Sequence, residues 1–479
     1  MSLRRALMLY FPGYREMSEE VYQALAQASS GFVESPAGCG KTEAIIRTVG
    51  NYCNGCQLIL THTHAGVDAL RQRFRRYSVP TTKYHVDTIA GWAWGWVRKY
   101  PENAGYTGST EIAEWKDIYA AMSVLLQRNF VKLGVTNSYT GIIVDEYQDC
   151  TIPMHQMIVQ LKTLLPCRVL GDDLQGIFGF DDPLIDWSVV TGEFDNNLGA
   201  LQTPHRWIKE GNEALGRWLL RTRPRFRQKQ EPDYGGSPID RRTVKYADLG
   251  TQLVRLTHEK KGRVCVIGPK TRPLPAGIET TLVNNKYKVL EPNELSALRS
   301  LILSLSDRSP TEKSKAACDF LFRSHGGLTG NDKAFIEKIL HGKNQRPRHA
   351  DKRFLCEKHT EGATPKLVFD LLKCIERIDG TSCKLLESVS ALKCIVEEYH
   401  ETNTDLKTLY ANEIGKRRYQ SRSNLYRCIG STLLVKGLEF DHVIILRDSD
   451  WQRKWGNHKD LYVALTRGSK TITLIELSS

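Results

Sequence analysis

The stretch that decides the fold is Ser35-Pro36-Ala37-Gly38-Cys39-Gly40-Lys41-Thr42. It follows a short apolar run, Gly31-Phe-Val-Glu34, and precedes an apolar helix start, Glu43-Ala-Ile-Ile46. A glycine-rich loop that joins a strand to a helix and ends in Gly-Lys-Thr is typical of loops that wrap around phosphate groups. The sequence therefore predicts an α/β domain that binds a nucleotide.

The residue types of this loop suit a triphosphate. Glycines let successive backbone amides point at phosphate oxygens, and the start of the helix adds partial positive charge. Lys41 is predicted to reach the β and γ phosphates, and Thr42 to place its hydroxyl on Mg²⁺. The position of the usual first glycine is Ser35. The residues expected to bind ATP are Ser35, Ala37, Gly38, Cys39, Gly40, Lys41 and Thr42.

A second apolar run, Gly141-Ile-Ile-Val144, ends in the acids Asp145 and Glu146. Carboxylates at the carboxyl end of a strand lie where α/β sheets bind ligands. Asp145 is predicted to hold Mg²⁺ through water, and Glu146 to orient the attacking water, which is the division of tasks that hydrolysis requires. The alternative is that the two acids only cap the next helix.

Short apolar strands alternate with helical stretches along most of the chain, which predicts layers of parallel sheet and helix, hence an α/β fold. Two clusters of strands are expected, before about residue 205 and after about residue 262. Between them, Arg221–Lys229 contains a proline and is interpreted as a basic loop that either contacts phosphates or is solvated. The expected strands are Leu58–Thr61, Ile142–Asp145, Arg168–Gly171, Val264–Ile267, Val443–Leu446 and Thr471–Ile475.

The region from about 293 to 426 is mainly helical and rich in lysine. Apolar residues recur there at helical spacing, which indicates core packing rather than a site. The region is interpreted as an insertion that splits the second α/β cluster. The residues with this spacing are Leu385, Leu386, Val389, Leu392, Val396 and Tyr399.

Composition narrows the class of protein. The 479 residues are 41% hydrophobic and 25% charged, which excludes a disordered or fibrous chain. No apolar run is long enough to span a membrane, and Ala6–Phe11 is too short for a secretory signal, so a cytoplasmic protein is expected.

The 67 Lys and Arg against 54 Asp and Glu give a net charge of +13, which favours an anionic partner such as nucleic acid. The 12 cysteines are expected to be reduced core thiols, with Cys53 and Cys56 as a weaker zinc candidate.

Four further motifs carry a family resemblance. They are Asp145-Glu-Tyr-Gln-Asp149, Val169-Leu-Gly-Asp-Asp-Leu-Gln175-Gly-Ile-Phe178-Gly-Phe180, Lys436-Gly437-Leu-Glu439-Phe and Tyr462-Val-Ala-Leu-Thr-Arg467. Together with the phosphate loop, and in this order, they resemble the motifs of UvrD/Rep-type superfamily 1 DNA helicases. The resemblance covers roughly residues 18–206, 263–292 and 427–479.

This resemblance implies two RecA-like domains that flank an ATP cleft, with single-stranded DNA across their top. The first domain is expected at 1–205 with a short helical insertion at about 93–140. The second is expected at 206–479 with a mainly helical insertion at about 293–426. The implied activity is a DNA-stimulated ATPase and 3′-to-5′ helicase, with ATP and Mg²⁺ as cofactors and single-stranded or single-strand-tailed DNA as partner.

The resemblance also implies roles for individual residues. Gln175 would sense the γ-phosphate, Arg206 would meet it from the second domain, and Arg467 would be the arginine finger. Gly437 and Glu439 would contact the nucleotide, Glu439 at its sugar, and His205 stands where a tyrosine stacks on the base. The expected DNA contacts are His62, Thr88, Phe178 and Phe180, with Trp92, Trp94 and Trp96 serving as a stacking surface or, more plausibly, as core anchors.

One departure concerns base recognition, because Val21 stands at the position of the glutamine that reads adenine in the family. Two more departures concern DNA binding, because Asp181 and Leu433 stand where the family has an arginine and a histidine. Since the triphosphate motifs are intact, ATP hydrolysis is expected before processive unwinding. The run from Asp145, with Met154-His155 after it, also resembles the helicase component of Gabija-type antiphage systems, which partners an ATPase–nuclease. The alternative function is thus an ATP-hydrolysing, DNA-end-sensing subunit that regulates a nuclease complex. A phosphate-loop kinase is a third interpretation, but it leaves Gln175, Phe178 and Arg467 unexplained.

Overall fold

The chain folds into two compact units. Unit 1 comprises Met1–Ile239 and Asn457–Lys470, and unit 2 comprises Asp240–Gly456 and Thr471–Ser479. The structure, a computed structural model, describes residues 12–107, 115–177, 183–268, 276–290, 295–341, 363–402, 404–418, 425–447 and 458–478. In these ranges, none of the helices combines the length and the apolar character that crossing a membrane requires.

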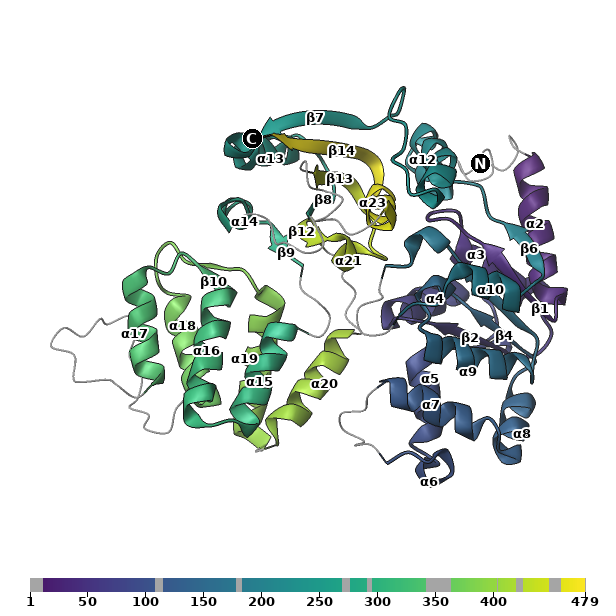
Figure 1. Ribbon diagram of the computed structural model, residues 1–479, viewed down its shortest axis with the longest axis horizontal. Coiled ribbons are helices and arrows are strands. Elements are labelled where there is room, and N and C mark those ends of the chain that lie inside the picture. The colour runs from purple at the N-terminus through teal and green to yellow at the C-terminus, as the bar shows by residue number, and fades with distance from the viewer. Residues whose placement is uncertain are drawn as a thin grey trace. The chain divides into compact units, whose positions relative to one another are not determined.

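Unit 1 is built on a six-stranded sheet with the order β3-β2-β4-β5-β1-β6. All of its strand pairings are parallel, and helices lie on both faces (Figure 1). The strands predicted at Leu58–Thr61, Ile142–Asp145 and Arg168–Gly171 are therefore confirmed to within a residue at each end. The strands are β1 (Ser30–Glu34), β2 (Gln57–Thr61), β3 (Tyr84–Thr88), β4 (Gly141–Val144), β5 (Cys167–Gly171) and β6 (Asn197–Ala200).

Near-continuous apolar runs make these strands because both faces of the sheet are covered. Along β2, Leu58 and Leu60 join one core cluster with helices α5, α7, α8 and α9, while Ile59 joins a second cluster with α2, α3 and α4. The helices of unit 1 are α2 (Pro12–Gln27), α3 (Lys41–Arg47), α4 (His64–Arg76), α5 (Ile89–Val97), α6 (Pro101–Ala104), α7 (Trp115–Leu125), α8 (Asn129–Ser138), α9 (Ile152–Lys162), α10 (Trp187–Glu193), α11 (His205–Lys209), α12 (Glu213–Arg227) and α23 (His458–Leu465).

The predicted basic loop at Arg221–Lys229 is wrong, because residues up to Arg227 form the end of helix α12. Pro224 lies inside this helix and on its exposed side. A proline removes one helical hydrogen bond and disfavours a helix interior. Here the apolar face outweighs that cost, since Trp218 and Phe226 are almost fully buried and the Phe226 ring lies 5.5 Å from the Tyr462 ring.

Unit 2 contains a second six-stranded sheet with the order β7-β14-β13-β8-β12-β9. The pairings of β7 with β14, of β8 with β13 and β12, and of β12 with β9 are parallel. The strands predicted at Val264–Ile267, Val443–Leu446 and Thr471–Ile475 lie within this sheet. Its strands are β7 (Asp240–Lys245), β8 (Val264–Gly268), β9 (Lys288–Val289), β12 (Arg427–Ser431), β13 (Phe440–Arg447) and β14 (Gly468–Ser478).

The helices of the expected insertion pack around a core of their own in unit 2 (Figure 1). Val389, Leu392 and Val396 are buried in that core as their spacing predicts, whereas Leu386 is 45% exposed. A short antiparallel pair, β10 (His325–Gly326) with β11 (Ser382–Cys383), joins them. The helices of unit 2 are α13 (Leu249–His258), α14 (Ala276–Asn284), α15 (Ser296–Asp307), α16 (Pro310–Ser324), α17 (Gly330–Leu340), α18 (Pro365–Ile375), α19 (Leu386–Thr402), α20 (Leu406–Arg418) and α21 (Thr432–Val435).

The division between the units differs from the expected boundary at 205/206. Unit 1 continues to Ile239 and takes back Asn457–Lys470 from the end of the chain. The physical reason is packing: Trp207 on α11 is buried, and its Nε1 donates to the carbonyl of Gly468 at 2.8 Å. The motif that ends in Arg467 therefore lies in the same unit as the phosphate loop.

Candidate nucleotide-binding site

The predicted phosphate loop connects β1 to α3. Ser35 N donates to Gly171 O at 2.8 Å, which anchors the start of the loop on the neighbouring strand β5. Gly38 and Gly40 have φ of 70° and 93°, which are left-handed values that favour glycine. A Cβ at Gly38 would also lie 2.8 Å from Trp207 Cζ3, so both backbone and space require glycine there. The glycines at positions 38 and 40 therefore allow the conformation that was predicted for the phosphate loop.

Lys41, the first residue of α3, lies beside two acids with 11% of its side chain exposed. Its Nζ lies 2.7 Å from Glu146 Oε2 and 3.6 Å from Asp145 Oδ1. Burial by itself lowers the pKa of Lys41, but the carboxylates of Glu146 and Asp145 outweigh burial and raise the pKa above its ordinary value. The lysine therefore stays charged, as binding of phosphate requires.

The two acids follow β4 directly, at the carboxyl edge of the sheet. Burial raises the pKa of Asp145 to about 6, and the charge of Lys41 limits that rise. Glu146 has a φ of 57°, which is uncommon for a residue other than glycine. Such backbone strain persists where the surroundings impose it and clusters at functional sites. This backbone places the Glu146 carboxylate toward Lys41, with Gln148 Nε2 donating to it at 2.5 Å.

Gln175, in the motif after β5, is hydrogen-bonded to Arg467, which follows helix α23. Its Nε2 donates to Asp172 Oδ2 at 2.8 Å, and its Oε1 accepts from Arg467 Nη2 at 3.0 Å. Both Gln175 and Arg467 are almost fully buried, at 6% and 2% exposure. The predicted γ-phosphate sensor and the predicted arginine finger are thus direct hydrogen-bond partners.

Helix α11 brings His205 and Arg206 to the phosphate loop. Arg206 N donates to Gly38 O at 3.1 Å, and Arg206 Nη1 donates to Thr466 O at 2.6 Å. The His205 ring lies next to Gly40, because a Cβ at Gly40 would come within 3.1 Å of His205 Cδ2. Arg206 and Arg467 both lie in unit 1, whereas the resemblance assigned them to the second domain.

The residues of the loop fit a magnesium-bound triphosphate. Thr42 and Asp145 offer oxygen ligands, which Mg²⁺ prefers, usually together with substrate phosphates and water. The Ser35 hydroxyl is buried and finds no hydrogen-bond partner among the described residues. The Cys39 thiol is neutral, because burial and then the charge of Asp172 raise its pKa to about 12. Within the described ranges, no group of three or more His, Cys, Asp or Glu side chains could hold a metal ion.

The predicted DNA contacts are only partly described. His62, after β2, is half-buried, and its Nε2 lies 3.6 Å from Cys150 Sγ. Thr88 is 3% exposed and caps α5, accepting from Gly91 N at 2.8 Å, so its hydroxyl already serves the helix. Phe178 and Phe180 lie outside the described residues. Trp92 is buried in the core of unit 1, which agrees with the interpretation of this tryptophan as a core anchor.

Gly437, Glu439 and Val21 are the remaining positions that the resemblance singles out. Gly437 and Glu439 belong to unit 2, where they lie between α21 and β13, and their contact with the nucleotide stays a prediction. Val21 on α2 is 6% exposed and belongs to the core of unit 1. A valine there packs against apolar neighbours and offers no hydrogen bond to a base.

Sequence reasoning did not identify Asp172 and Arg223 as site residues. Asp172 is fully buried and accepts from Ala37 N in the phosphate loop at 3.2 Å. Arg223 Nη1 donates to Asp172 Oδ1 at 2.8 Å. The signal for Arg223 was present in the apolar spacing along α12, but the interpretation of Arg221–Lys229 as a loop hid it.

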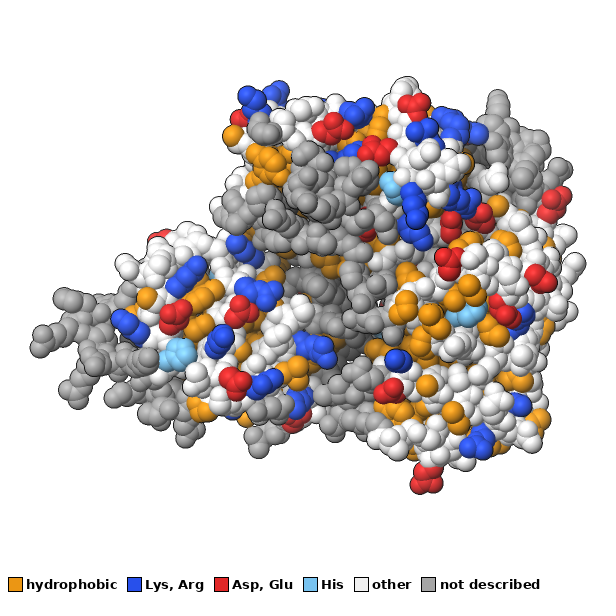
Figure 2. Space-filling model, in the orientation of Figure 1, with side chains coloured by type: hydrophobic (Ala, Val, Ile, Leu, Met, Phe, Trp, Pro, Cys, Tyr) orange, Lys and Arg blue, Asp and Glu red, His pale blue; other side chains and the backbone are white. Residues whose placement is uncertain are grey.

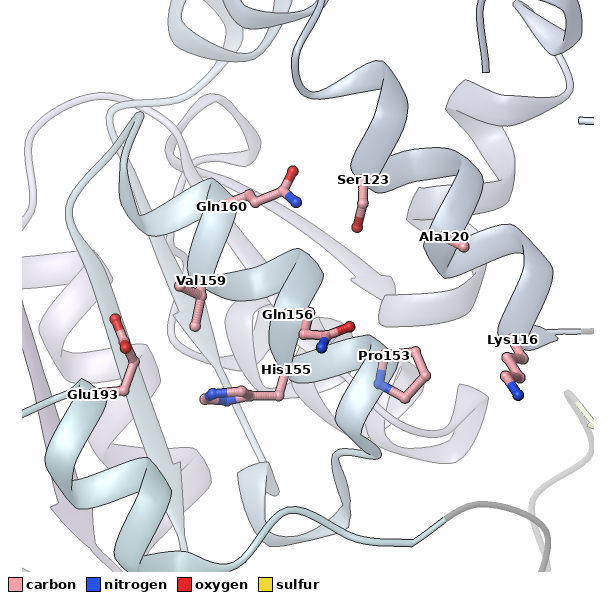
Figure 3. A pocket seen from close by; sticks show the side chains of 9 residues that line it. All are labelled: Lys116, Ala120, Ser123, Pro153, His155, Gln156, Val159, Gln160 and Glu193. Atoms are coloured by element: carbon pink, nitrogen blue, oxygen red, sulfur yellow. The ribbon is translucent and has the colours of Figure 1, made fainter. Parts of the chain in front are cut away.

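A separate pocket of about 610 Å³ lies between α7 and α9 in unit 1 (Figure 3). Lys116, Ala120 and Ser123 line it from α7, and His155 and Gln156 line it from α9. None of its lining residues is a predicted site residue. His155 is tied to the motif after β4, because its Nδ1 lies 2.8 Å from the Tyr147 hydroxyl.

Comparisons with curated proteins and solved structures give only distant similarity. No curated protein matches the sequence. Two solved structures of the arterivirus nonstructural protein 10 helicase, one of them in complex with DNA, have 12% and 11% identity, with TM-scores of 0.36 and 0.35. They match 95% of this chain, which spans only 63% and 61% of their length. TM-scores of this size support no conclusion about this chain.

A match to a protein family covers the last fifth of the chain. The model described as the viral superfamily 1 RNA helicase core domain matches residues 378–476. This segment contains the motifs at Lys436–Phe440 and Tyr462–Arg467. The match agrees with superfamily 1, while the UvrD/Rep type and the Gabija type stay predictions. Residues 378–476 are therefore similar to the core domain of superfamily 1 helicases.

Proposed function

We propose that this chain is an ATP-dependent DNA helicase that moves 3′-to-5′ on single-stranded DNA. One observation carries the proposal: Lys41, the acids after β4, Gln175 and Arg467 form a connected cluster behind the phosphate loop. A binding site alone needs a loop and a lysine. Hydrolysis also needs an acid that orients the attacking water and arginines that stabilise the charge developing on the phosphate.

In the proposed reaction a water oxygen attacks the γ-phosphorus of ATP. The bond from the γ-phosphorus to the bridging oxygen of ADP breaks, and ADP and phosphate leave. Glu146 orients and polarises the water, and Lys41 holds the phosphates. Arg206 and Arg467 stabilise the charge that develops, and Gln175 reports the state of the γ-phosphate. Bound Mg²⁺ would be held by Thr42 and Asp145 and would neutralise charge on the phosphates.

The anionic partner is proposed to be single-stranded DNA. The net charge of +13 supports a nucleic acid, and the helicase match at residues 378–476 supports movement along it. On the face drawn in Figure 2, Lys and Arg side chains are spread over both units and interspersed with Asp and Glu side chains. Phe178, Phe180 and His62 are proposed to stack on bases, which tolerates any sequence.

ATP turnover tests the proposal directly. The purified chain should hydrolyse ATP slowly alone and faster with single-stranded DNA, and the same assay with duplex ends and with RNA identifies the preferred nucleic acid. Displacement of a strand from a 3′-tailed duplex, but not from a 5′-tailed one, then tests unwinding and polarity. Turnover without displacement would instead favour the regulatory subunit of a nuclease complex in antiphage defence. No turnover under any condition would refute both.

A further inference from the structure

Arg223 is buried among three carboxylates in unit 1. Its guanidinium donates to Asp172 Oδ1 at 2.8 Å, to Glu34 Oε1 at 2.7 Å and to Asp173 Oδ1 at 3.3 Å. It also donates to the Tyr462 hydroxyl at 2.6 Å. The Arg223 side chain is only 6% exposed, and its bonds to Asp172 and Tyr462 are buried, whereas Glu34 and Asp173 are partly exposed. One residue of α12 thus joins the end of β1, the segment after β5, and α23.

Among the partners of Arg223, Asp172 is the one that contacts both the phosphate loop and Gln175. It has no solvent exposure, and burial of an unpaired carboxylate would cost several kcal/mol. Its oxygens accept from Ala37 N of the phosphate loop, from Gln175 Nε2 and from the Tyr462 hydroxyl. Arg223 is the cation in ion-pair contact with Asp172. Arg223 therefore holds in place the acid that connects the phosphate loop to Gln175.

The same contacts reach the predicted arginine finger by two routes. In one, Arg223 holds Asp172, Asp172 holds Gln175, and Gln175 accepts from Arg467. In the other, Arg223 holds the Tyr462 hydroxyl, and Tyr462 lies on α23, the helix that ends just before Arg467. A small displacement of a group that acts on the transition state lowers its effect strongly.

We propose that Arg223 is a positioning residue for ATP hydrolysis, which holds Gln175 through Asp172 and holds the segment carrying Arg467 through Tyr462. This inference rests on the proposed ATPase activity. Arg223 contacts no reacting atom in this scheme. Its contribution is the rigid, planar fork of the guanidinium, which donates to four acceptors in fixed directions, whereas the lysine ammonium has only three donors on a flexible stem.

The first test is Arg223→Lys, which keeps the charge that Asp172 needs and loses the fork. We expect kcat for ATP hydrolysis to fall about tenfold or more, while the melting temperature and the affinity for a non-hydrolysable ATP analogue stay close to those of the unaltered chain. The matched control is Arg227→Lys. Arg227 lies one turn further along α12 and pairs with Glu34 and Asp173, but the described contacts of Arg227 do not include Asp172 or Tyr462.

A mutant cycle separates positioning from a general loss of structure. If Arg223 acts through Arg467, then Arg223→Lys should cost less than about twofold in kcat once Arg467→Ala is present. Tyr462→Phe removes one hydroxyl from the second route and should lower kcat in the same direction, which gives a second variant if Arg223→Lys folds poorly.

The outcomes are distinct. The inference is overturned if Arg223→Lys and Tyr462→Phe both hydrolyse ATP within about twofold of the unaltered chain, or if the loss is as large with Arg467→Ala as without it. In either case an active unaltered chain and an inactive Lys41→Ala variant in the same assay would leave the proposed function standing. An unaltered chain that hydrolyses no ATP would overturn the function and the inference together.

Discussion

Lys41 Nζ lies 2.7 Å from Glu146 Oε2, so the lysine of the phosphate loop and the acid predicted to orient water form an ion pair. Phosphate oxygens that enter the loop would compete with this carboxylate for the same ammonium group. Glu146 would then be released from Lys41 at the moment when ATP is in place. The pair therefore connects nucleotide binding with the freedom of the proposed catalytic acid.

Lys41→Ala should abolish ATP turnover, because no other charged side chain would hold the β and γ phosphates from the loop. The measurement is steady-state phosphate release with saturating single-stranded DNA. Lys83→Ala is a suitable control, since Lys83 Nζ donates to Gly50 O and Cys53 O, away from the loop. Turnover of Lys41→Ala close to that of Lys83→Ala would contradict the assignment of the loop.

Glu146→Gln should lower kcat by about 10²- to 10⁴-fold, the usual contribution of a positioned acid or base. Nucleotide affinity should stay or rise, because the amide no longer competes as an anion for Lys41. Phosphate release gives kcat, and titration of a fluorescent ATP analogue gives affinity. A variant that loses affinity and keeps kcat would show that Glu146 binds the nucleotide and takes no part in the chemistry.

The most buried strands of both sheets could be predicted from the sequence, because buried parallel strands are short, apolar and bounded by turns. The less buried strands β3, β6, β7, β9 and β12 were not predicted. The conformation of the phosphate loop could also be predicted, since Gly38 and Gly40 sit at left-handed positions. Both features depend on local chemistry.

The environment of Arg223 could not be predicted in the same way. Pro224 indicates a loop locally, but tertiary packing of Trp218 and Phe226 keeps the helix. The partners of Arg223, which are Asp172 and Tyr462, are 51 and 239 residues away along the chain. No periodicity relates positions at such separations. At Thr88, whose contact with DNA stays a prediction, the structure adds that the hydroxyl accepts a helix-cap bond from Gly91 N.

Asp173→Asn should destabilise the protein in a manner that depends on pH. Burial raises the pKa of Asp173, but the hydrogen bond and charge of Arg227 outweigh burial and lower the pKa below its ordinary value. A lowered carboxyl pKa contributes stability above the unfolded pKa of about 4, and this contribution is lost as pH falls through the folded pKa. The expected loss at pH 7 is about 1 kcal/mol, because Arg227 is partly exposed.

Melting temperatures measured from pH 7 down to about pH 3, which is below the unfolded pKa of about 4, would check this dependence. The difference between Asp173→Asn and the unaltered chain should shrink as pH falls. Asp195→Asn, at an exposed position in the same unit, serves as the control and should show little difference at any pH. A constant difference for Asp173→Asn across the range would mean that the ion pair with Arg227 contributes nothing to stability.

Arg467→Ala should slow ATP hydrolysis by about 10³-fold or more, the range measured for arginines that stabilise charge in phosphoryl transfer. Affinity for ATP should change far less, because Lys41 and the loop amides remain. Since Arg467 Nη2 donates to Gln175 Oε1, the variant Gln175→Ala should share part of this loss, and the double variant should lose less than the two single losses multiplied. Phosphate release and analogue titration on all three variants would measure this. Arg467 would not be a finger if its removal lowered affinity and turnover equally, because the arginine would then bind the ground state as tightly as the transition state.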